Sequence, residues 1–225
     1  MRTHAPPARP DLLAGEKLPP APLQQRSLDK RARLEAAGLA LFGEKGYEGT
    51  SIEEIARRAG LATGGFYGHF RSKRQLLLAL TDELLESLGR LDLRPSAGGD
   101  VRVGLREMLA RALSSDLRYL GAYRAWQEAA LADPDLARKQ EAIHAWTTAR
   151  VATALQHMQQ LPGARAGLDI PALAHAFDRF FWSLLADAVR SPDVEVEQWV
   201  DAATHLVYHA LFTDLPQRVR RGRTA

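Results

Sequence analysis

The chain contains no cysteine among its 225 residues. Without cysteine, neither a disulfide framework nor a cysteine-based zinc site can form, and a reducing cytoplasm is compatible with the composition. No apolar run approaches the roughly 18 residues that are needed to span a bilayer, and the first residues hold no apolar signal core. The sequence therefore predicts a soluble cytoplasmic protein without a membrane segment.

Motifs of common catalytic sites are also missing. No glycine-rich phosphate loop, nucleophile elbow or paired acidic motif occurs. His205 and His209 have a spacing that can bind a metal from one helix face, but no glutamate of a zinc hydrolase motif lies between them. We interpret them as a packed or interfacial pair, and we expect neither an enzyme nor a bound metal or cofactor.

Charge is unevenly distributed along the chain. Residues 26–75 contain ten Lys and Arg against six Asp and Glu, whereas residues 76–214 contain thirteen against nineteen. A basic first domain therefore precedes an acidic body. This asymmetry is expected when one end of a protein touches nucleic acid.

The stretch 50–75, TSIEEIARRAGLATGGFYGHFRSKRQ, contains two helix-start signals. Ser51 and Glu54 form a capping-box pair, and Ser72 with Gln75 forms a second pair. Between these starts, the sequence predicts one helix at 52–59 and another at about 62–69.

Small and bulky residues in this stretch follow the spacing of a helix-turn-helix. Ala56 allows the two helices to approach, Gly60 makes the turn, and Phe66 fills the angle between the helices. In that motif the second helix lies in the major groove of DNA. A plain helical hairpin with solvated charges is the alternative.

The segment AGLATGGFYGHFRSKRQLL, preceded by GYEGTSIEEIA, resembles the DNA-binding domain of the tetracycline-repressor (TetR) family. The resemblance runs from about Ser27 to Leu80. It implies that Ser51, Tyr67, His69 and Lys73 contact phosphates and that Thr63, Gly65 and Gly68 face base edges. Two of those three base-facing residues are glycines, which departs from the usual pattern of the family.

Helix polarity and local charge give two further arguments for phosphate contacts, at Lys73 and Lys30. Lys73 lies in the first turn of a helix, where the dipole disfavours a cation by about 0.3–1 kcal/mol, so a phosphate contact would explain it. Lys30 belongs to a basic cluster that either contacts phosphates or is a solvated face. The predicted DNA-binding residues are Lys30, Ser51, Thr63, Gly64, Gly65, Tyr67, His69 and Lys73.

No alternating strand pattern occurs beyond residue 72, and the chain is expected to be all-α with about nine helices. Ser27 is expected to cap the first helix, and Asp133 followed by Pro134 to start the seventh. The expected helices are at about 27–45, 52–59, 62–69, 73–91, 101–115, 120–131, 134–161, 171–190 and 195–215.

Four regions are expected. Residues 1–25 hold six prolines and are interpreted as a disordered arm, with a basic arm in the minor groove as the alternative. Residues 26–75 form the helix-turn-helix domain, and residues 76–215 a helical ligand-binding and dimerisation domain. Residues 216–225 are a basic tail, solvated or touching DNA.

The two last helices are apolar nearly all round. A helix without a polar face is buried on every side, so one side is expected to pack inward and the other to meet a partner. Paired helices of two protomers would form a four-helix interface, as the family resemblance also implies. We therefore predict a homodimer.

Aromatic residues gather in the helical body. Sparse polar groups among them, such as Gln127, Arg150 and His175, could anchor a ligand. Nothing in the pattern fixes the charge of the ligand, so an apolar or aromatic molecule is expected; packing as plain core is the alternative. The predicted ligand-binding residues are Tyr123, Trp126, Trp146, Phe177, Asp178 and Phe181.

Together these features predict a dimeric repressor that binds a palindromic operator in double-stranded DNA and is released by a small ligand. Two alternatives stay open: a helical adaptor that binds protein, and an activator without a small-molecule inducer. An enzyme carrying a helix-turn-helix is disfavoured because no catalytic constellation was found.

Overall fold

The computed structural model describes residues 8–19, 24–94, 100–190 and 195–213. These residues form nine α-helices and no β-strand, and one isolated bridge joins Ala164 to Phe212. The helices are α1 (Gln25–Lys45), α2 (Ile52–Arg58), α3 (Thr63–Tyr67), α4 (Lys73–Arg90), α5 (Val101–Arg118), α6 (Leu120–Ala132), α7 (Pro134–Met158), α8 (Ile170–Arg190) and α9 (Val196–Leu211). The all-α prediction is confirmed for these residues. None of the nine helices is both long and apolar enough to span a membrane.

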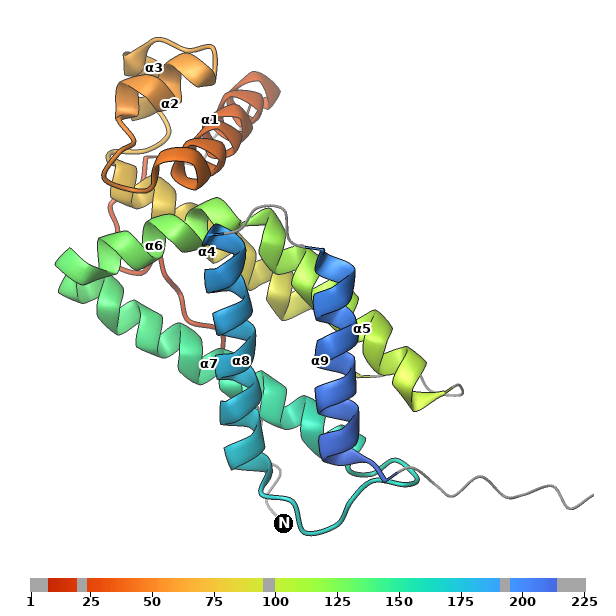
Figure 1. The fold of residues 1–225 in the computed structure, drawn as a ribbon. Helices are drawn as coiled ribbons and strands as arrows, with labels where there is room; N and C mark the ends of the chain where they lie inside the picture. The colour runs from red at the N-terminus through yellow and green to blue at the C-terminus, as the bar shows by residue number, and fades with distance from the viewer. Residues whose placement is uncertain (1–7, 20–23, 95–99, 191–194, 214–225) are drawn as a thin grey trace, which may run out of the picture.

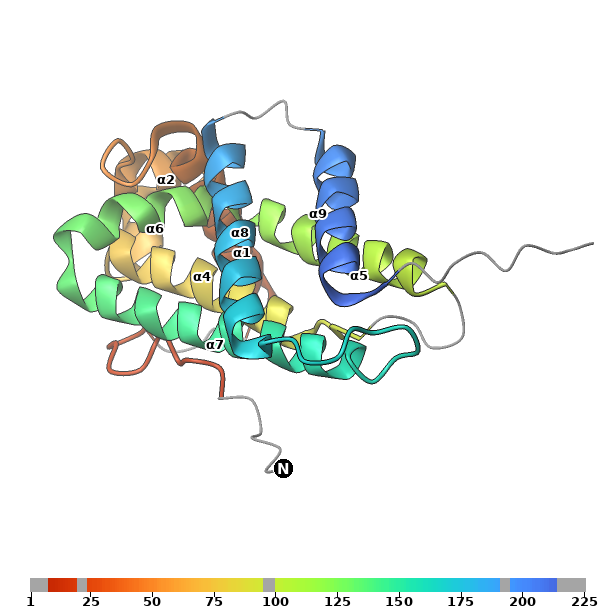
Figure 2. The ribbon, with the colours of Figure 1, turned by 60° about the horizontal axis from the view of Figure 1, so that its bottom comes forward.

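Helices α1–α3 form a small unit at one end of the molecule, and the remaining helices form a longer body (Figure 1). Helix α4 runs from that unit into the body, and α6 lies across the boundary. Helices α8 and α9 lie next to one another on one face, in front of α7 and α5 (Figures 1 and 2). The body is therefore layered, with α8 and α9 outermost.

Two predicted helix starts are confirmed by their capping bonds. The Oγ of Ser51 accepts from the backbone N–H of Glu54 at 3.2 Å, and the carboxylate of Glu54 accepts in return from the backbone N–H of Ser51. At the start of α7, the carboxylate of Asp133 accepts from the backbone N–H groups of Asp135 and Leu136. These local signals fix where α2 and α7 begin because they satisfy donors that a helix leaves free.

The predicted cap of the first helix is wrong. Ser27 lies inside α1, whose N-cap is Gln24, without a side-chain capping bond. The backbone N–H groups of Ser27 and Leu28 donate to the carbonyl of Gln24, so the first turn forms before Ser27. Four other helix ends differ from the prediction by two residues or more: α3 stops at Tyr67, α5 extends to Arg118, α7 stops at Met158 and α9 at Leu211.

Two hydrophobic cores hold the fold. The first core joins α1–α4 to α6 and the first half of α7, and it includes Phe42, Phe66, Phe70 and Trp126. The second core joins α5, the end of α7, α8 and α9. The boundary predicted between residues 75 and 76 therefore falls within α4, inside the first core and not at a break in the chain.

The interpretation of residues 1–25 as disordered is wrong for residues 8–19, which we call the N-terminal strap. Leu12 is fully buried, and its carbonyl accepts from Lys139 Nζ at 3.0 Å. Arg9 pairs with Asp82 at 2.6 Å, and Glu16 pairs with Arg74. These contacts offset the ordering cost of the strap, which composition alone does not reveal. Residues 1–7 and 20–23 and the predicted tail at 216–225 lie outside the described residues.

Candidate nucleic-acid interface and ligand cavity

The helix-turn-helix is built by α2, α3 and the turn between them. Gly60 adopts φ +69°, the left-handed conformation that favours glycine, and the backbone N–H of Leu61 donates to the carbonyl of Ala56. Phe66 is fully buried between the helices, and its ring lies 5.7 Å from that of Phe70. The roles that the sequence suggested for Gly60 and Phe66 within the motif are thus seen in the fold.

Several predicted contact residues lie open to solvent in this unit. Tyr67 is 51% exposed, with its ring packed edge-on against Phe66. Lys30 and Gly64 are exposed, and Thr63 is partly exposed at the first position of α3. These residues can meet a nucleic acid without rearrangement of the protein.

Ser51 has a structural partner already. Its Oγ caps α2, as described above, and also lies 3.3 Å from the Glu54 carboxylate. The side chain is partly exposed, and its single O–H donor is directed at Glu54. Phosphate contact by Ser51 would therefore require this O–H to turn from Glu54, while the oxygen keeps its capping bond.

Lys73 does not need a phosphate to explain its place in the first turn of α4. Its ammonium donates to the carbonyls of Tyr47, at 2.5 Å, and Thr50, at 2.9 Å. The same group lies 4.2 Å from the centre of the Tyr47 ring. An ammonium has three N–H donors, so two are engaged within the protein and one remains. These carbonyl partners lie 26 and 23 residues away along the chain, so helix polarity alone does not predict them.

His69 is buried, with only 7% of its surface exposed. Burial lowers the pKa of its imidazole from the ordinary value, and the nearby Arg31 and Lys30 lower the pKa further. A neutral, buried imidazole is a poor phosphate ligand. The structure therefore disfavours the phosphate contact that the family resemblance implied for His69.

The predicted glycines of α3 differ from one another. A Cβ at Gly65 would lie 3.3 Å from the Cβ of Leu61, a tight contact that a small shift of Leu61 would have to relieve. A Cβ at Gly64 would meet nothing within 4 Å, and one at Gly68 only the carbonyl of Gly65 at 3.6 Å. Packing in the free protein therefore explains the missing side chain of neither Gly64 nor Gly68, and Gly64 is the more open of the two positions.

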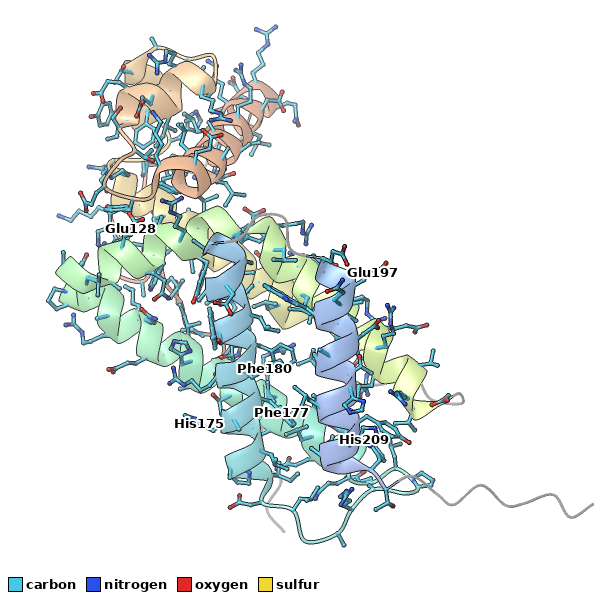
Figure 3. All side chains as sticks on the ribbon, in the orientation of Figure 1. Glu128, His175, Phe177, Phe180, Glu197 and His209 are labelled. Atoms are coloured by element: carbon cyan, nitrogen blue, oxygen red, sulfur yellow. The ribbon has the colours of Figure 1, made fainter. Side chains whose placement is uncertain are left out.

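Close packing of α1 on α6 links this unit to the body. A Cβ on Gly121 would lie 2.0 Å from the carbonyl oxygen of Leu39, so α6 contacts the α1 backbone directly. The Glu128 carboxylate, at the α6 edge of the boundary in Figure 3, accepts from the backbone N–H of Tyr47 at 2.6 Å. Arg124 donates to the carbonyl of Gly43 at 2.7 Å. Movement of α6 would therefore be transmitted to α1.

A cavity of about 130 Å³ lies in the body between α4, α5, α7, α8 and α9. Its lining is mostly apolar and includes four predicted residues: Trp146, Phe177, Asp178 and Phe181. A pocket among the fourth to eighth helices is expected from the sequence, but no lining residue from α4, its C-cap or α5 is predicted; these include Leu88, Leu91, Met108 and Leu113. The apolar spacing of 105, 108, 109, 112 and 113 was the available signal for α5.

Two predicted ligand contacts lie outside this cavity. Trp126 is buried in the first core, near the boundary with α1–α3. Tyr123 stacks on Trp182, with ring centres 5.5 Å apart, and its hydroxyl donates to the carbonyl of that residue. Trp182 itself lines the cavity, so Tyr123 supports the wall from behind. Gln127 does not line the cavity, and His175 projects outward from α8, away from Phe177 and Phe180 (Figure 3).

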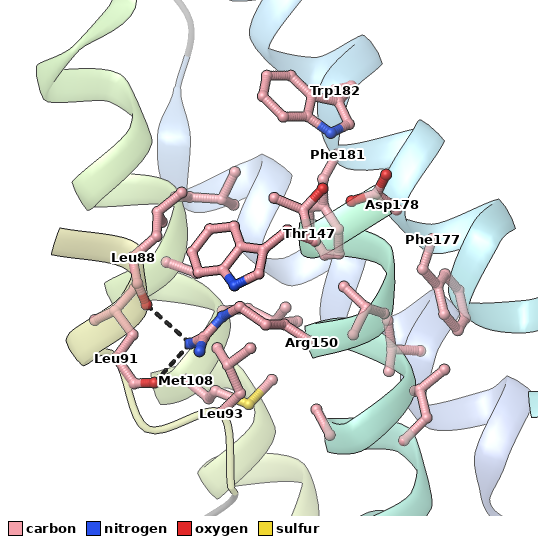
Figure 4. Close-up of a pocket in the computed structure, with 18 of the residues that line it drawn as sticks. Leu88, Leu91, Leu93, Met108, Thr147, Arg150, Phe177, Asp178, Phe181 and Trp182 are labelled. Atoms are coloured by element: carbon pink, nitrogen blue, oxygen red, sulfur yellow. Dashed lines mark hydrogen bonds between the residues drawn. The ribbon is translucent and has the colours of Figure 1, made fainter. Parts of the chain in front are cut away.

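Two ionisable side chains line the cavity. Asp178 is 3% exposed, and its carboxylate accepts from Thr148 Oγ1 at 2.9 Å and lies 4.0 Å from His144 Nδ1. Burial is the main cause that lowers the pKa of His144, so this imidazole is neutral near pH 7. Arg150 donates through Nη2 to the carbonyls of Leu88 and Leu91, at 2.8 and 3.0 Å (Figure 4).

The outer faces of α8 and α9 carry small and apolar residues. Ala172, Ala176 and Ala202 are exposed, and Leu206 is 49% exposed. On α9, the rings of His205 and His209 lie 4.3 Å apart. The described residues hold no group of three or more His, Asp or Glu side chains arranged to bind a metal ion.

A family model described as "Bacterial regulatory proteins, tetR family" matches residues 34–80. The HTH-type transcriptional regulator AcrR of Shigella flexneri is 33% identical over 94 residues, which are 41% of this chain and 44% of that protein. The uncharacterised HTH-type transcriptional regulator YerO of Bacillus subtilis (strain 168) is 43% identical over 51 residues, 23% of this chain and 18% of that protein. The chain thus matches less than half the length of either relative.

Solved structures are similar in fold over most of this chain. The SmeT–triclosan complex aligns with a TM-score of 0.65 at 23% identity, over 87% of this chain and 99% of that one. NalD, the secondary repressor of the MexAB-OprM multidrug efflux pump in Pseudomonas aeruginosa, aligns with a TM-score of 0.59 at 18% identity, over 84% and 100%. The helix-turn-helix geometry described above agrees with the family-model match: residues 34–80 form a DNA-binding unit of the kind found in the TetR family of bacterial regulatory proteins.

Proposed function

We propose that this protein is a sequence-specific DNA-binding repressor that places α3 in the major groove. The observation that carries the proposal is the exposed face of the helix-turn-helix, where Tyr67 projects and Gly64 leaves the α3 backbone open. The matched relatives are transcriptional regulators, and no catalytic role is proposed. A repressor of this kind would act in the cytoplasm, on operator DNA.

Phosphate and base contacts divide between different residues in this proposal. Lys30, Ser51, Tyr67 and the remaining N–H of Lys73 would contact phosphates and position the protein. Thr63, at the start of α3, would read base edges, and Gly64 would let the backbone approach the DNA. Gly65 and His69 act within the protein, through packing against Leu61 and as a buried neutral imidazole.

A dimer would present two copies of α3 to a palindromic operator. The outer faces of α8 and α9 are proposed as the interface, because their exposed alanines allow close helix approach and Leu206 would be removed from water. The interface would be isologous, with each α8–α9 pair meeting its copy.

The cavity is proposed as an inducer site for a small apolar or aromatic molecule. Its apolar lining with two ionisable groups is typical of small-molecule sites. SmeT, which shares the fold, forms a complex with triclosan. A ligand that prefers one of two body conformations would release the DNA, because α4 and α6 connect the cavity region to α1–α3.

Selection of bound sequences from random duplex DNA tests this function. The expected result is one palindromic sequence whose binding weakens steeply as salt rises. A selected site without two-fold symmetry would argue against the proposed dimer. No enrichment at low salt would refute the DNA-binding function and favour a protein-binding adaptor.

A further inference from the structure

Arg150 is the cationic group of the cavity, and its charge has no anionic partner among the described residues. No carboxylate oxygen of those residues lies within 4.0 Å of its nitrogens, and its hydrogen-bond acceptors are the two neutral carbonyls of Leu88 and Leu91. Its guanidinium carbon lies 5.1 Å from the centre of the Trp146 ring. A guanidinium stays charged in proteins, so a partly buried positive charge faces an apolar space.

Burial lowers the pKa of Arg150 from its ordinary value, with no nearby charge that raises it. Asp178, the other ionisable residue of the lining, is engaged by Thr148 and lies near Trp182, apart from the Arg150 guanidinium (Figure 4). An anion bound beside Arg150 would therefore add the attraction of an ion pair to its hydrogen bond. A neutral ligand would gain the hydrogen bond alone, and a cationic ligand would be repelled.

The size of the cavity limits the ligand. Its volume of about 130 Å³ is similar to the roughly 150 Å³ of an engineered apolar cavity that binds benzene. We propose that the cavity selects a compact aromatic carboxylate, with the ring among the apolar side chains and the carboxylate on Arg150. This inference rests on the proposed inducer site, and it names the chemical class that the site takes.

The hydrogen bonds of Arg150 connect this ligand to α4. A guanidinium grips a carboxylate with two parallel N–H···O bonds either through Nε and Nη2 or through Nη1 and Nη2. Both arrangements require Nη2, and in this structure Nη2 serves the carbonyls of Leu88 and Leu91 at the end of α4. A bidentate carboxylate therefore displaces at least one of these carbonyls from Nη2. Loss of that hydrogen bond loosens the last turn of α4, the helix that begins at Lys73.

Binding of benzoate, benzamide and benzylamine to the full-length protein without DNA tests the ligand class, by ligand-observed NMR titration. These probes share a ring and differ in charge. Benzoate is expected to bind at least about 10-fold more tightly than benzamide, since only benzoate forms an ion pair with two parallel hydrogen bonds to the guanidinium. Equal binding of benzoate and benzamide, or tighter binding of benzylamine, would overturn the proposal; the latter would point to Asp178.

Variants of Arg150 locate the selectivity. Arg150→Met is expected to abolish the preference for benzoate, while Arg90→Met, at the exposed last residue of α4, keeps it. Arg150→Lys retains charge but loses the planar fork, so benzoate affinity falls several-fold and benzamide affinity stays unchanged. If Arg150→Met fails to fold, an unchanged benzoate affinity in Arg150→Lys would still refute the role of the fork.

Hydrogen exchange tests the connection to α4. Peptides covering residues 84–94 are expected to exchange faster in protein saturated with benzoate than in protein saturated with benzamide. Unchanged or slower exchange with benzoate would refute the loosening of α4. All three experiments use free protein, so their failure is distinguishable from a failure to bind operator DNA, which the sequence selection measures separately.

Discussion

At the scale of single residues, substitutions of Tyr67 and Lys73 distinguish a residue that only contacts DNA from one that also stabilises the fold. Tyr67→Phe removes an exposed hydroxyl, so DNA affinity is expected to fall about 2- to 10-fold for all sequences, with an unchanged melting temperature. Lys73→Met also removes two bonds to carbonyls, so both affinity and melting temperature fall. Fluorescence anisotropy over a salt series, beside thermal melts, measures both quantities. A changed sequence preference in Tyr67→Phe would contradict a phosphate role.

Gly64 offers a direct test of backbone approach to DNA. Alanine at this position meets nothing within 4 Å, and it is favoured over glycine in a helix by about 1 kcal/mol. Gly64→Ala is therefore expected to keep or raise the melting temperature while it lowers operator affinity. Gly68→Ala, whose new methyl would meet ordinary contact distances, is the matched comparison. Full operator affinity in Gly64→Ala would exclude close approach there.

His69 should make stability depend on pH. Its folded pKa lies below the ordinary value of 6.5, so the unfolded chain binds more protons as the pH falls below 6.5. Its contribution is therefore fully present above pH 6.5 and is lost as the pH falls through the window between the unfolded and folded pKa values. The pKa of His144 is also lowered, so its contribution to stability is likewise lost as the pH falls. Urea unfolding between pH 7.5 and 5 measures the free energy of unfolding at each pH. This free energy should change less with pH in His69→Gln than in the exposed control variant His157→Gln.

These residues also mark the limits of prediction from sequence. The exposed place of Tyr67, the turn at Gly60 and the cap by Ser51 follow from motifs that act within a few residues, and reading the sequence identified them. The carbonyls that hold Lys73 lie 26 and 23 residues away, and two of the causes that lower the pKa of His69 are the charges of Arg31 and Lys30 on α1. Such contacts depend on tertiary packing, which neither periodicity nor motif spacing records.

At the scale of elements, the composition of the N-terminal strap predicts disorder, whereas the structure shows the strap packed against the fold. Its prolines suggested disorder, but Leu12 is fully buried against the first core. Leu12→Ala is expected to lower the free energy of unfolding by about 2–5 kcal/mol, as for other buried leucines. Leu18→Ala, at a strap residue near the surface, should change it by less than about 0.5 kcal/mol. Equal effects of the two substitutions would mean that the strap is not packed in solution.

The ligand cavity shows the same division between local and tertiary information. Aromatic clustering in α7 and α8 led to Trp146, Phe177 and Phe181, because neighbouring turns of one helix share a face. It also misplaced Trp126, since a residue on α6 can face either the cavity or α1. The sequence identifies Arg150 as a polar group that could anchor a ligand, but it does not show that the charge of Arg150 lacks an anionic partner. Only its distances to the carbonyls of Leu88 and Leu91 reveal an unbalanced charge.

At the scale of the whole molecule, the proposed repressor requires two protomers. One α3 covers one half-site, and two half-sites on the same face of DNA lie about 34 Å apart, so one chain cannot contact both. Linking the two contacts through a dimer raises the effective concentration of the second α3 to about the millimolar range. Operator affinity should therefore depend on the α8–α9 face, far from the DNA-contacting residues (Figure 1).

Leu206→Glu tests that dependence because Leu206 lies on the outer face of α9 and is 49% exposed. A charge buried against its copy is costly, so the variant is expected to be monomeric by light scattering and to lose at least about 100-fold in operator affinity. Leu131→Glu, on α6, is the control: Leu131 is 90% exposed and lies outside the proposed interface. It should remain dimeric and bind normally. A Leu206→Glu variant that stays dimeric would contradict the α8–α9 interface, and a monomer with full affinity would contradict the need for two protomers.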